Sequence, residues 1–245
     1  ISEFISSQAL ETLRSRHDII YGPDLHKDRP ALIAAMQNIE ALIVRNLTQV
    51  NEEVLIASPQ LKVVGRLGVG LENIELPACA KRNIQVIPAT GANAESVAEY
   101  VVGAAVALTR GFIPATISTL KGDWPRPRFS GYHEFLGQTL GIVGFGRIGQ
   151  LVAHRMRAFG MDVVAYDPYL QPARAAQLNV KLVELDELLR VSDFITIHLP
   201  KTKETANLIG VEALKKVKKE VRIINAARGG VLDEAALYDA IVEGR

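Results

Sequence analysis

The chain has 245 residues, of which 48 % are hydrophobic, so it can form one large domain or two ordinary ones with a sizeable core. Its 28 basic and 27 acidic residues leave a formal net charge of +1, which offers no excess of positive charge to nucleic acid or to a membrane surface. The single cysteine, Cys79, excludes a disulfide framework and a thiolate metal cluster. We therefore expect a soluble, cytoplasmic protein without nucleic-acid or membrane partners.

Short β-branched runs alternate with helical patterns along the chain. Such runs are nearly continuous in apolar residues, which is typical of parallel strands buried on both faces. We expect strands at residues 41–44, 62–66, 85–87, 139–143, 162–166, 194–198 and 222–225. With helices between them, they predict an α/β fold built from two doubly wound parallel-sheet domains.

A stretch rich in small residues at 88–93 predicts the domain boundary. We place one α/β domain at 1–92 and a second at 93–245, and we expect a helix at 94–110 because its apolar residues recur at helical spacing. The Pro- and Gly-rich stretch 121–137 is predicted to be a loop. It is either a surface connection or an arm that packs on a partner subunit, and the residues favour neither.

A glycine-rich motif follows the first strand of the second domain. Gly144, Gly146 and Gly149 form a G-x-G-x-x-G pattern after a strand that ends at Val143. A helix at 148–159 follows, with Gly160 as its C′ residue. The next strand leads to an acidic residue, Asp167. This order is the fingerprint of a dinucleotide-binding unit, whereas the glycines alone would be weak evidence.

Each part of the motif has a physical role. Gly144 permits a sharp turn, Gly146 lets a diphosphate approach the backbone, and Gly149 lets the helix pack closely on the sheet. The start of the helix offers N–H groups and partial positive charge to phosphates. Asp167 is placed to accept hydrogen bonds from a ribose and to repel a 2′-phosphate, which favours NAD over NADP. The alternative is a glycine-rich turn that binds nothing.

Several further blocks occur in a characteristic order at 64–73, 88–100, 193–200 and 224–234. With these blocks the chain resembles the D-isomer-specific 2-hydroxyacid dehydrogenases, and within them the D-3-phosphoglycerate dehydrogenase branch. The resemblance implies a flavodoxin-like substrate-binding domain and a Rossmann NAD-binding domain. It also implies hydride transfer between nicotinamide and C2 of a D-2-hydroxy acid, a role in serine biosynthesis, and a homodimer formed through the helix after Asn93 and the arm around Trp124.

The resemblance also implies roles for single residues. Arg228 matches the catalytic arginine, and a guanidinium just beyond a strand can grip a carboxylate and polarise the adjacent carbonyl. Val69 and Gly70 match the loop whose N–H groups hold the substrate carboxylate. Further positions that match the lining of the cofactor site are Arg147, Ile148, Leu199, Pro200, Ala226 and Ala227, together with Arg228 itself.

Two more arginines bear on specificity. Arg45 and Arg66 each end a strand of the first domain, where the phosphoglycerate branch contacts the distal phosphate of its substrate. We therefore expect a small 2-hydroxy or 2-oxo acid with a second anionic group. A sulfonate would use the same arginines, so sulfolactate stays open. Glyoxylate or hydroxypyruvate as substrate, or a non-enzymatic NAD-binding module such as a corepressor, are further alternatives.

No residue is assigned as the general acid and base. In the family this histidine and its glutamate lie beyond the arginine block, and the sequence stops before either position, so we expect a longer polypeptide. His198 is a poor substitute because its counterpart in the family is not the base. His17, His26, His133 and His154 show no metal-ligand spacing, and no metal site is predicted.

Overall fold

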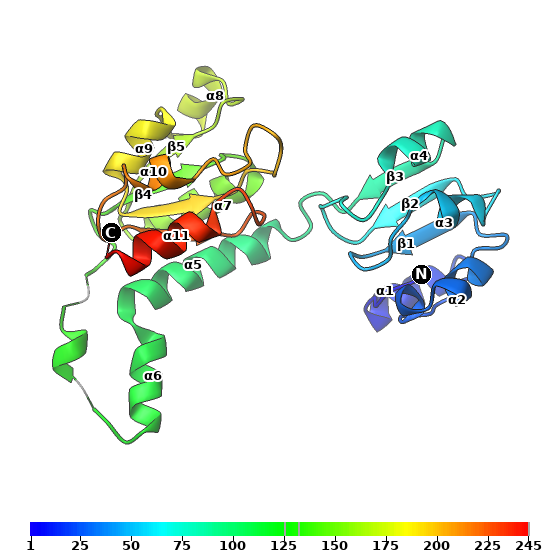
Figure 1. Cartoon of the computed structure of the whole chain (residues 1–245), viewed down its shortest axis with the longest axis horizontal. Helices are drawn as coiled ribbons and strands as arrows, with labels where there is room; N and C mark the ends of the chain where they lie inside the picture. Colours follow the sequence, from blue (N-terminus) through cyan, green and yellow to red (C-terminus); the bar gives the residue numbers. More distant parts are fainter. Residues whose placement is uncertain (125, 132, 245) are drawn as a thin grey trace. The chain divides into compact units, whose positions relative to one another are not determined.

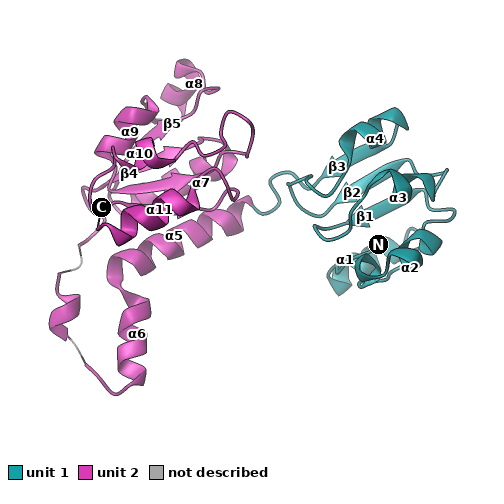
Figure 2. Cartoon of the chain, viewed as in Figure 1, with its two compact units in different colours: residues 1–93 teal, residues 94–245 magenta. Residues whose placement is uncertain are grey.

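The computed structural model describes residues 1–124, 126–131 and 133–244 of the chain. It divides into two compact units, residues 1–93 and 94–245 (Figure 2). The division falls within one residue of the boundary expected from composition. Each unit has its own parallel sheet and its own buried core.

The first unit is built on a three-stranded sheet in the order β1–β2–β3 (Figure 1). The strands are β1 (Ala41–Val44), β2 (Val63–Arg66) and β3 (Gln85–Pro88). Its helices are α1 (Ser7–Arg14), η1 (Leu25–Lys27), α2 (Arg29–Ala35), α3 (Glu52–Ile56) and α4 (Leu76–Lys81). The core includes Leu32 of α2, Val44 of β1, Leu55 of α3 and Val64 of β2, all at most 2 % exposed. This burial of apolar side chains from every layer drives the unit to fold.

Backbone hydrogen bonds extend this sheet beyond the three strands. Ile1 donates to Ile20 at 2.8 Å and accepts from Gly22 at 3.0 Å, which is the pattern of a parallel pair. Ser2 on the other side donates to Ile43 of β1 at 3.2 Å. The first two residues therefore lie between the segment at 20–22 and β1, and the order becomes that of a flavodoxin-like sheet. The predicted fold class of this unit is confirmed.

The second unit contains a five-stranded parallel sheet in the order β6–β5–β4–β7–β8. The strands are β4 (Thr139–Val143), β5 (Asp162–Tyr166), β6 (Lys181–Leu182), β7 (Phe194–Ile197) and β8 (Arg222–Asn225). Starting from β4, the chain adds β5 and β6 on one side of the sheet, and it then adds β7 and β8 on the other side. The direction of strand addition therefore reverses between β4 and β7. This is the doubly wound Rossmann topology, and the predicted fold class is again confirmed.

Helices cover both faces of the second sheet. One core contains Leu140, Ile142 and Phe194 with side chains of α5 (Ala94–Arg110) and α7 (Arg147–Ala158). The other contains Val143, Ile195 and Ile197 with side chains of the helices that follow later in the chain. These helices are α9 (Leu185–Val191), α10 (Val211–Leu214) and α11 (Glu234–Val242), whereas α8 (Pro172–Gln177) contributes Ala175 to the first core. Burial on both faces explains why the strands read as continuous apolar runs.

Helix α6 (Phe112–Leu120) was not expected from the sequence, and it has no buried residue. It follows α5 after Gly111, whose φ of 61° breaks the helix, and it extends away from the sheet (Figure 1). Among the described residues no single helix has the length and apolar character to cross a membrane. Only α5 and α6 together meet that test, and they are bent by 62°. The predicted loop after α6 contains a short turn, η2 (Arg126–Phe129), while Pro125 and Tyr132 lie outside the described residues.

Candidate nucleotide and substrate sites

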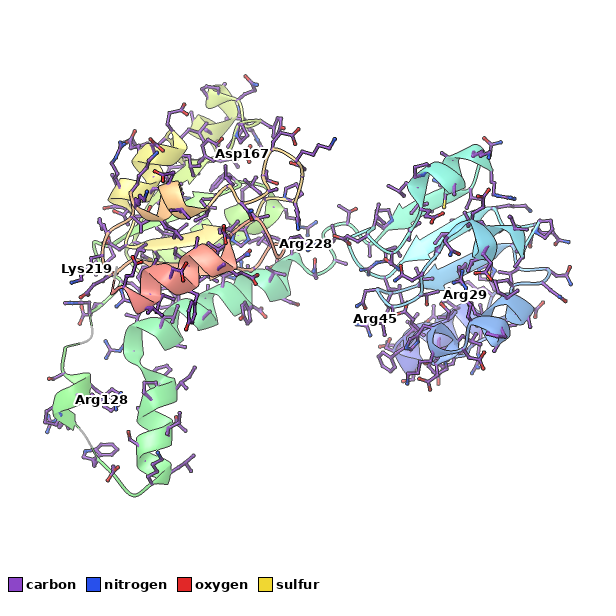
Figure 3. All side chains as sticks on the ribbon, viewed as in Figure 1. Arg29, Arg45, Arg128, Asp167, Lys219 and Arg228 are labelled. Atoms are coloured by element: carbon purple, nitrogen blue, oxygen red, sulfur yellow. The ribbon has the colours of Figure 1, made fainter. Side chains whose placement is uncertain are left out.

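The ends of the strands bring most of the predicted cofactor residues to one edge of the second sheet. Val143 of β4 pairs with Tyr166 of β5 and with Ile197 of β7, which in turn pairs with Asn225 of β8. Because all these strands are parallel, the residues that follow them share the carboxyl edge. Figure 3 shows Asp167 and Arg228 in this unit. A reversal of strand order at the carboxyl ends is where open α/β sheets bind ligands.

The three glycines meet three different constraints. Gly144 has φ +96°, which L side chains rarely adopt, and a Cβ there would lie 2.9 Å from Leu199. At Gly149 a Cβ would lie 2.5 Å from the carbonyl oxygen of Gly144, so helix α7 could not pack as closely on β4. At Gly146 a Cβ would meet no protein atom within 4 Å. The backbone at Gly146 is therefore open to the approach of another group.

The start of α7 offers donors beside that space. The first bond of the helix runs from the N–H of Gln150 to the carbonyl of Gly146. Within the described part of the chain, the N–H groups of Gly146, Arg147 and Ile148 donate to no protein acceptor. The helix begins at Arg147, one residue earlier than expected. Unpaired N–H groups and the positive end of the helix dipole make the start of α7 a suitable binding site for a diphosphate.

Asp167 is tied to the glycine-rich turn. Its Oδ2 accepts from the N–H of Phe145 at 2.8 Å, and its Oδ1 accepts from the N–H of Tyr169 at 2.9 Å. The N–H of Gly144 donates to the carbonyl of Tyr166, the residue before Asp167, at 2.8 Å. These contacts fix the carboxylate at the end of β5 beside the glycine-rich turn. Each carboxylate oxygen can accept a further hydrogen bond, so the group can also receive ribose hydroxyls.

The turn after β8 holds Arg228 through a residue that the sequence reasoning missed. The Asn225 side chain accepts from the N–H of Ala227 at 3.1 Å and donates to the carbonyl of Arg228 at 3.0 Å. The Arg228 side chain is exposed, and its Nη1 donates to the carbonyl of Ala227. Ala226 leads into this turn. A strand-terminal asparagine is only a weak signal for such a turn, because asparagine side chains form several other kinds of turn.

The neighbouring strand β7 ends in the other predicted cofactor positions. Its last residue is Ile197, one earlier than expected. Leu199 is buried and lies against the backbone of the glycine-rich turn. Pro200 is exposed, and its carbonyl accepts from the Thr205 hydroxyl at 2.6 Å. Leu199 and Pro200 therefore share the carboxyl edge with the glycine-rich turn.

His198 is unsuited to proton transfer near neutral pH. Burial lowers the pKa of its imidazole to about 4, so the ring is neutral at physiological pH. Its Nε2 bonds to the Thr196 hydroxyl at 2.9 Å, whereas Nδ1 is buried and has no partner among the described residues. A general acid–base needs a pKa close to the working pH, which supports the expectation that His198 is not that group.

None of the other histidines directly follows a strand of the second sheet. His154 is exposed on α7 and His133 is exposed in the segment before β4. His17 lines a cavity of about 770 Å³ at the amino end of β1, together with Ile1 and Glu40 but with none of the candidate residues. Within the described ranges, no group of three or more His, Cys, Asp or Glu residues could hold a metal ion.

The first unit places Arg45 and Arg66, the two arginines expected to contact a second anion of the substrate, at the ends of adjacent strands. Val44 at the end of β1 pairs with Arg66 at the end of β2, so Arg45 and Arg66 lie at the carboxyl edge of adjacent strands. The Arg66 side chain folds back over Gly68, where a Cβ would lie 1.9 Å from its Nη1. Its Nη1 donates to the carbonyl of Leu67 at 2.7 Å, and its Nε is buried without a partner among the described residues.

Val69 and Gly70 lie in the loop that follows β2. Val69 is exposed and Gly70 is half-buried. In the part of the chain that the structure describes, neither of their N–H groups donates to a protein acceptor. Adjacent unpaired N–H groups in a glycine-rich loop suit an anion such as a carboxylate.

Comparisons with known proteins identify the family to which the chain is similar. Residues 102–245 match the sequence profile described as D-isomer specific 2-hydroxyacid dehydrogenase, NAD binding domain. The chain is 52 % identical to a D-3-phosphoglycerate dehydrogenase of Mycobacterium tuberculosis over 89 % of this chain and 41 % of that protein. It is 43 % identical to an (S)-sulfolactate dehydrogenase of Chromohalobacter salexigens over 97 % of this chain and 77 % of that protein.

The fold of the chain is also similar to that of a solved structure. The NAD-dependent formate dehydrogenase of Staphylococcus aureus, in complex with NAD, aligns with a TM-score of 0.82 and 32 % identity over 97 % of this chain and 72 % of that one. The chain spans about two fifths of the length of the mycobacterial relative. The chain belongs to the D-isomer-specific 2-hydroxyacid dehydrogenase family, and its second unit contains the NAD-binding domain of that family.

Proposed function

We propose that this chain is part of an NAD-dependent oxidoreductase that transfers a hydride between nicotinamide and C2 of a D-2-hydroxy acid, with 3-phosphoglycerate as the favoured substrate. We favour this substrate because Arg45 and Arg66 lie at the ends of adjacent strands of the first unit. Two guanidinium groups there suit a second anion on the substrate. The relatives named D-3-phosphoglycerate dehydrogenase support this choice. A role in serine biosynthesis and a cytoplasmic location belong to the same proposal.

We assign each candidate residue a separate role in this reaction. NAD, when bound, supplies the hydride acceptor. The N–H groups at the start of α7 hold its diphosphate, and Asp167 holds the adenosine ribose. Arg228 grips the carboxylate and polarises the C2 oxygen, while the N–H groups of Val69 and Gly70 bind the carboxylate. The hydroxyl proton needs a base, and we assign none among the residues of this chain.

Three alternative substrates and one alternative function make different predictions. A sulfolactate dehydrogenase would use the same two arginines, since a sulfonate is also a tetrahedral anion, and the relative from Chromohalobacter salexigens favours this candidate. For glyoxylate or hydroxypyruvate, Arg45 and Arg66 would be incidental. A corepressor-like module would bind NAD without turnover. Arg228 together with Arg45 and Arg66 favours the enzyme, because a pure sensor has no need of three cations that face a substrate.

Turnover with NAD on D-3-phosphoglycerate, sulfolactate and D-glycerate tests the proposal. We expect kcat/KM for phosphoglycerate to exceed that for glycerate by about 100-fold, because each charge-assisted contact with the distal anion contributes roughly 1.5–3 kcal/mol. Equal values for glycerate and phosphoglycerate would contradict the role of the distal anion. A higher value for sulfolactate would reassign the substrate.

We also propose a homodimer formed through α5, α6 and the arm around Trp124. The large apolar side chains of this region are exposed: Tyr100, Leu108, Phe112, Ile113, Ile117, Leu120 and Trp124. An apolar helix without buried residues is typical of an association surface. Ile117→Glu should convert the dimer to a monomer in sedimentation measurements, whereas Gln177→Glu, a polar-to-charged change at an exposed position of α8, should leave the equilibrium unchanged. A monomeric wild-type protein would contradict this proposal.

A further inference from the structure

The loop after β1 is held by a carboxylate from the start of the chain. Glu3 accepts hydrogen bonds from the N–H groups of Arg45 at 2.8 Å, Leu47 at 3.1 Å and Thr48 at 2.9 Å. Glu3 is only 2 % exposed. Burial would raise the pKa of this carboxyl, but the hydrogen bonds from Thr48, Leu47 and Arg45 hold it below its usual range. The carboxylate thus replaces the water that these three N–H groups would otherwise bind.

The carbonyl groups of the same loop are held from the other side. Asn73 Nδ2 donates to the carbonyl of Arg45 at 3.1 Å and to that of Thr48 at 2.7 Å. Asn73 is 8 % exposed, and its own carbonyl accepts from Val50 at 2.8 Å. It follows the loop that contains Gly70. One buried amide therefore joins the loop proposed to hold the substrate carboxylate to the loop that presents Arg45.

The position of this network in the sheet connects it with ligand binding. Glu3 follows Ser2, whose N–H donates to Ile43, and Arg45 follows the end of β1. The order of the sheet reverses between the strand formed by residues 1–2 and β1. Flavodoxin-like sheets bind ligands at such a reversal, outside the carboxyl ends of the strands. The Arg45 guanidinium also lies 6.0 Å from the ring centroid of Phe4. The backbone of Arg45 is thus fixed at both its N–H and its C=O, and its side chain lies over an aromatic ring.

We infer that Glu3 and Asn73 are positioning residues that preorganise the Arg45 loop for the second anionic group of the substrate. This inference rests on the proposed function. A guanidinium on a fixed loop loses less conformational freedom when it binds than one on a loose loop, so preorganisation increases affinity. The negative charge of Glu3 by itself disfavours a nearby anion. Its contribution is therefore geometric, and removing the charge should weaken anion binding rather than strengthen it.

The test compares calorimetric Kd values for D-3-phosphoglycerate and D-glycerate in the presence of NADH. In Glu3→Gln, which keeps the size of the side chain but loses one acceptor oxygen, we expect the preference for phosphoglycerate to fall about tenfold. Asn73→Ser, which removes the bonds to the loop carbonyls, should give a similar loss. Glu3→Asp keeps the carboxylate and should restore part of the preference. Glu11→Gln, on the exposed side of α1, is the matched control and should leave the preference unchanged.

The outcomes separate this inference from the function on which it rests. A wild-type protein without preference for phosphoglycerate would overturn the proposed substrate and this inference together. A wild-type preference that survives or increases in folded Glu3→Gln would overturn the inference alone. If Glu3→Gln does not fold, Asn73→Ser decides by the same criterion. Faster amide hydrogen exchange at residues 45–48 in either variant, at unchanged global stability, would support the geometric role.

Discussion

The same substitution at Gly146, the N-cap residue of α7, and at Gly149, in the first turn of α7, should have different consequences. At Gly149 a new Cβ would lie 2.5 Å from the carbonyl oxygen of Gly144 and 3.1 Å from Cγ2 of Ile142. At Gly146 it would meet no protein atom within 4 Å, and the φ of −71° is open to any residue. We therefore expect Gly149→Ala to lower the stability of the fold, and Gly146→Ala to act mainly on cofactor binding.

The sizes of the effects follow from these distances. The contact at Gly149 is about 1 Å shorter than ordinary van der Waals contact, and its partner is backbone that cannot rotate away. Such overpacking costs about 1–3 kcal/mol of unfolding free energy, and the displaced turn also weakens NADH binding. Gly146→Ala exchanges one N-cap residue for a poorer one, so it should cost less than about 1 kcal/mol. Its methyl group fills the space left for the diphosphate and should weaken NADH binding by about 100-fold, or roughly 3 kcal/mol.

Urea denaturation and calorimetric titration with NADH measure the two effects separately. Gly103→Ala on α5, where a Cβ meets no atom within 4 Å, is the control and should leave NADH binding unchanged. Wild-type affinity for NADH in Gly146→Ala would refute the placement of the diphosphate. An equal loss of stability in Gly146→Ala and Gly149→Ala would refute the reasoning from close approach.

Three further predictions concern single side chains. Asp167→Ala should reduce the ratio of NAD to NADP affinity by about tenfold, and an unchanged ratio would show that the ribose lies elsewhere. Arg228→Lys should keep NAD binding but reduce kcat by about 100-fold, because an ammonium lacks the two-pronged contact; undiminished turnover would remove Arg228 from the reaction. Because burial lowers the pKa of His198 from 6.5 to about 4, the unfolded state binds the proton more readily, and the unfolding free energy should fall as the pH drops through that window. An NMR titration of the folded protein with a ring midpoint near pH 6.5 would contradict this.

The parts of the fold that could be predicted are those with a local signal. Helix α5 was expected at residues 94–110 and is found at Ala94–Arg110, because its apolar positions recur at one period. Strand β6 has only two residues, which is too short for a pattern. Helix α6 is apolar on more than one side and is separated from α5 only by Gly111. Its sequence therefore lacks the contrast between a buried and an exposed face on which the prediction depends.

The same limit applies to the candidate sites. The glycine-rich turn and Asp167 were identified because their roles depend on near neighbours in the chain. Glu3 was missed because its partners lie 42–45 residues away, and a polar residue near the start of a chain gives no sign of burial. Asn225 bonds only two and three residues ahead, but an asparagine at the end of a strand has too many other uses to predict a brace.

The central claim is that a dinucleotide lies across the carboxyl edge of the second sheet, with its diphosphate on the start of α7. A crystal structure of the protein with NADH tests this most directly. We expect diphosphate oxygens within hydrogen-bond distance of the N–H groups of Arg147 and Ile148, and ribose hydroxyls on the Asp167 carboxylate. Cofactor bound away from this edge, or a diphosphate that does not touch the start of α7, would contradict the account.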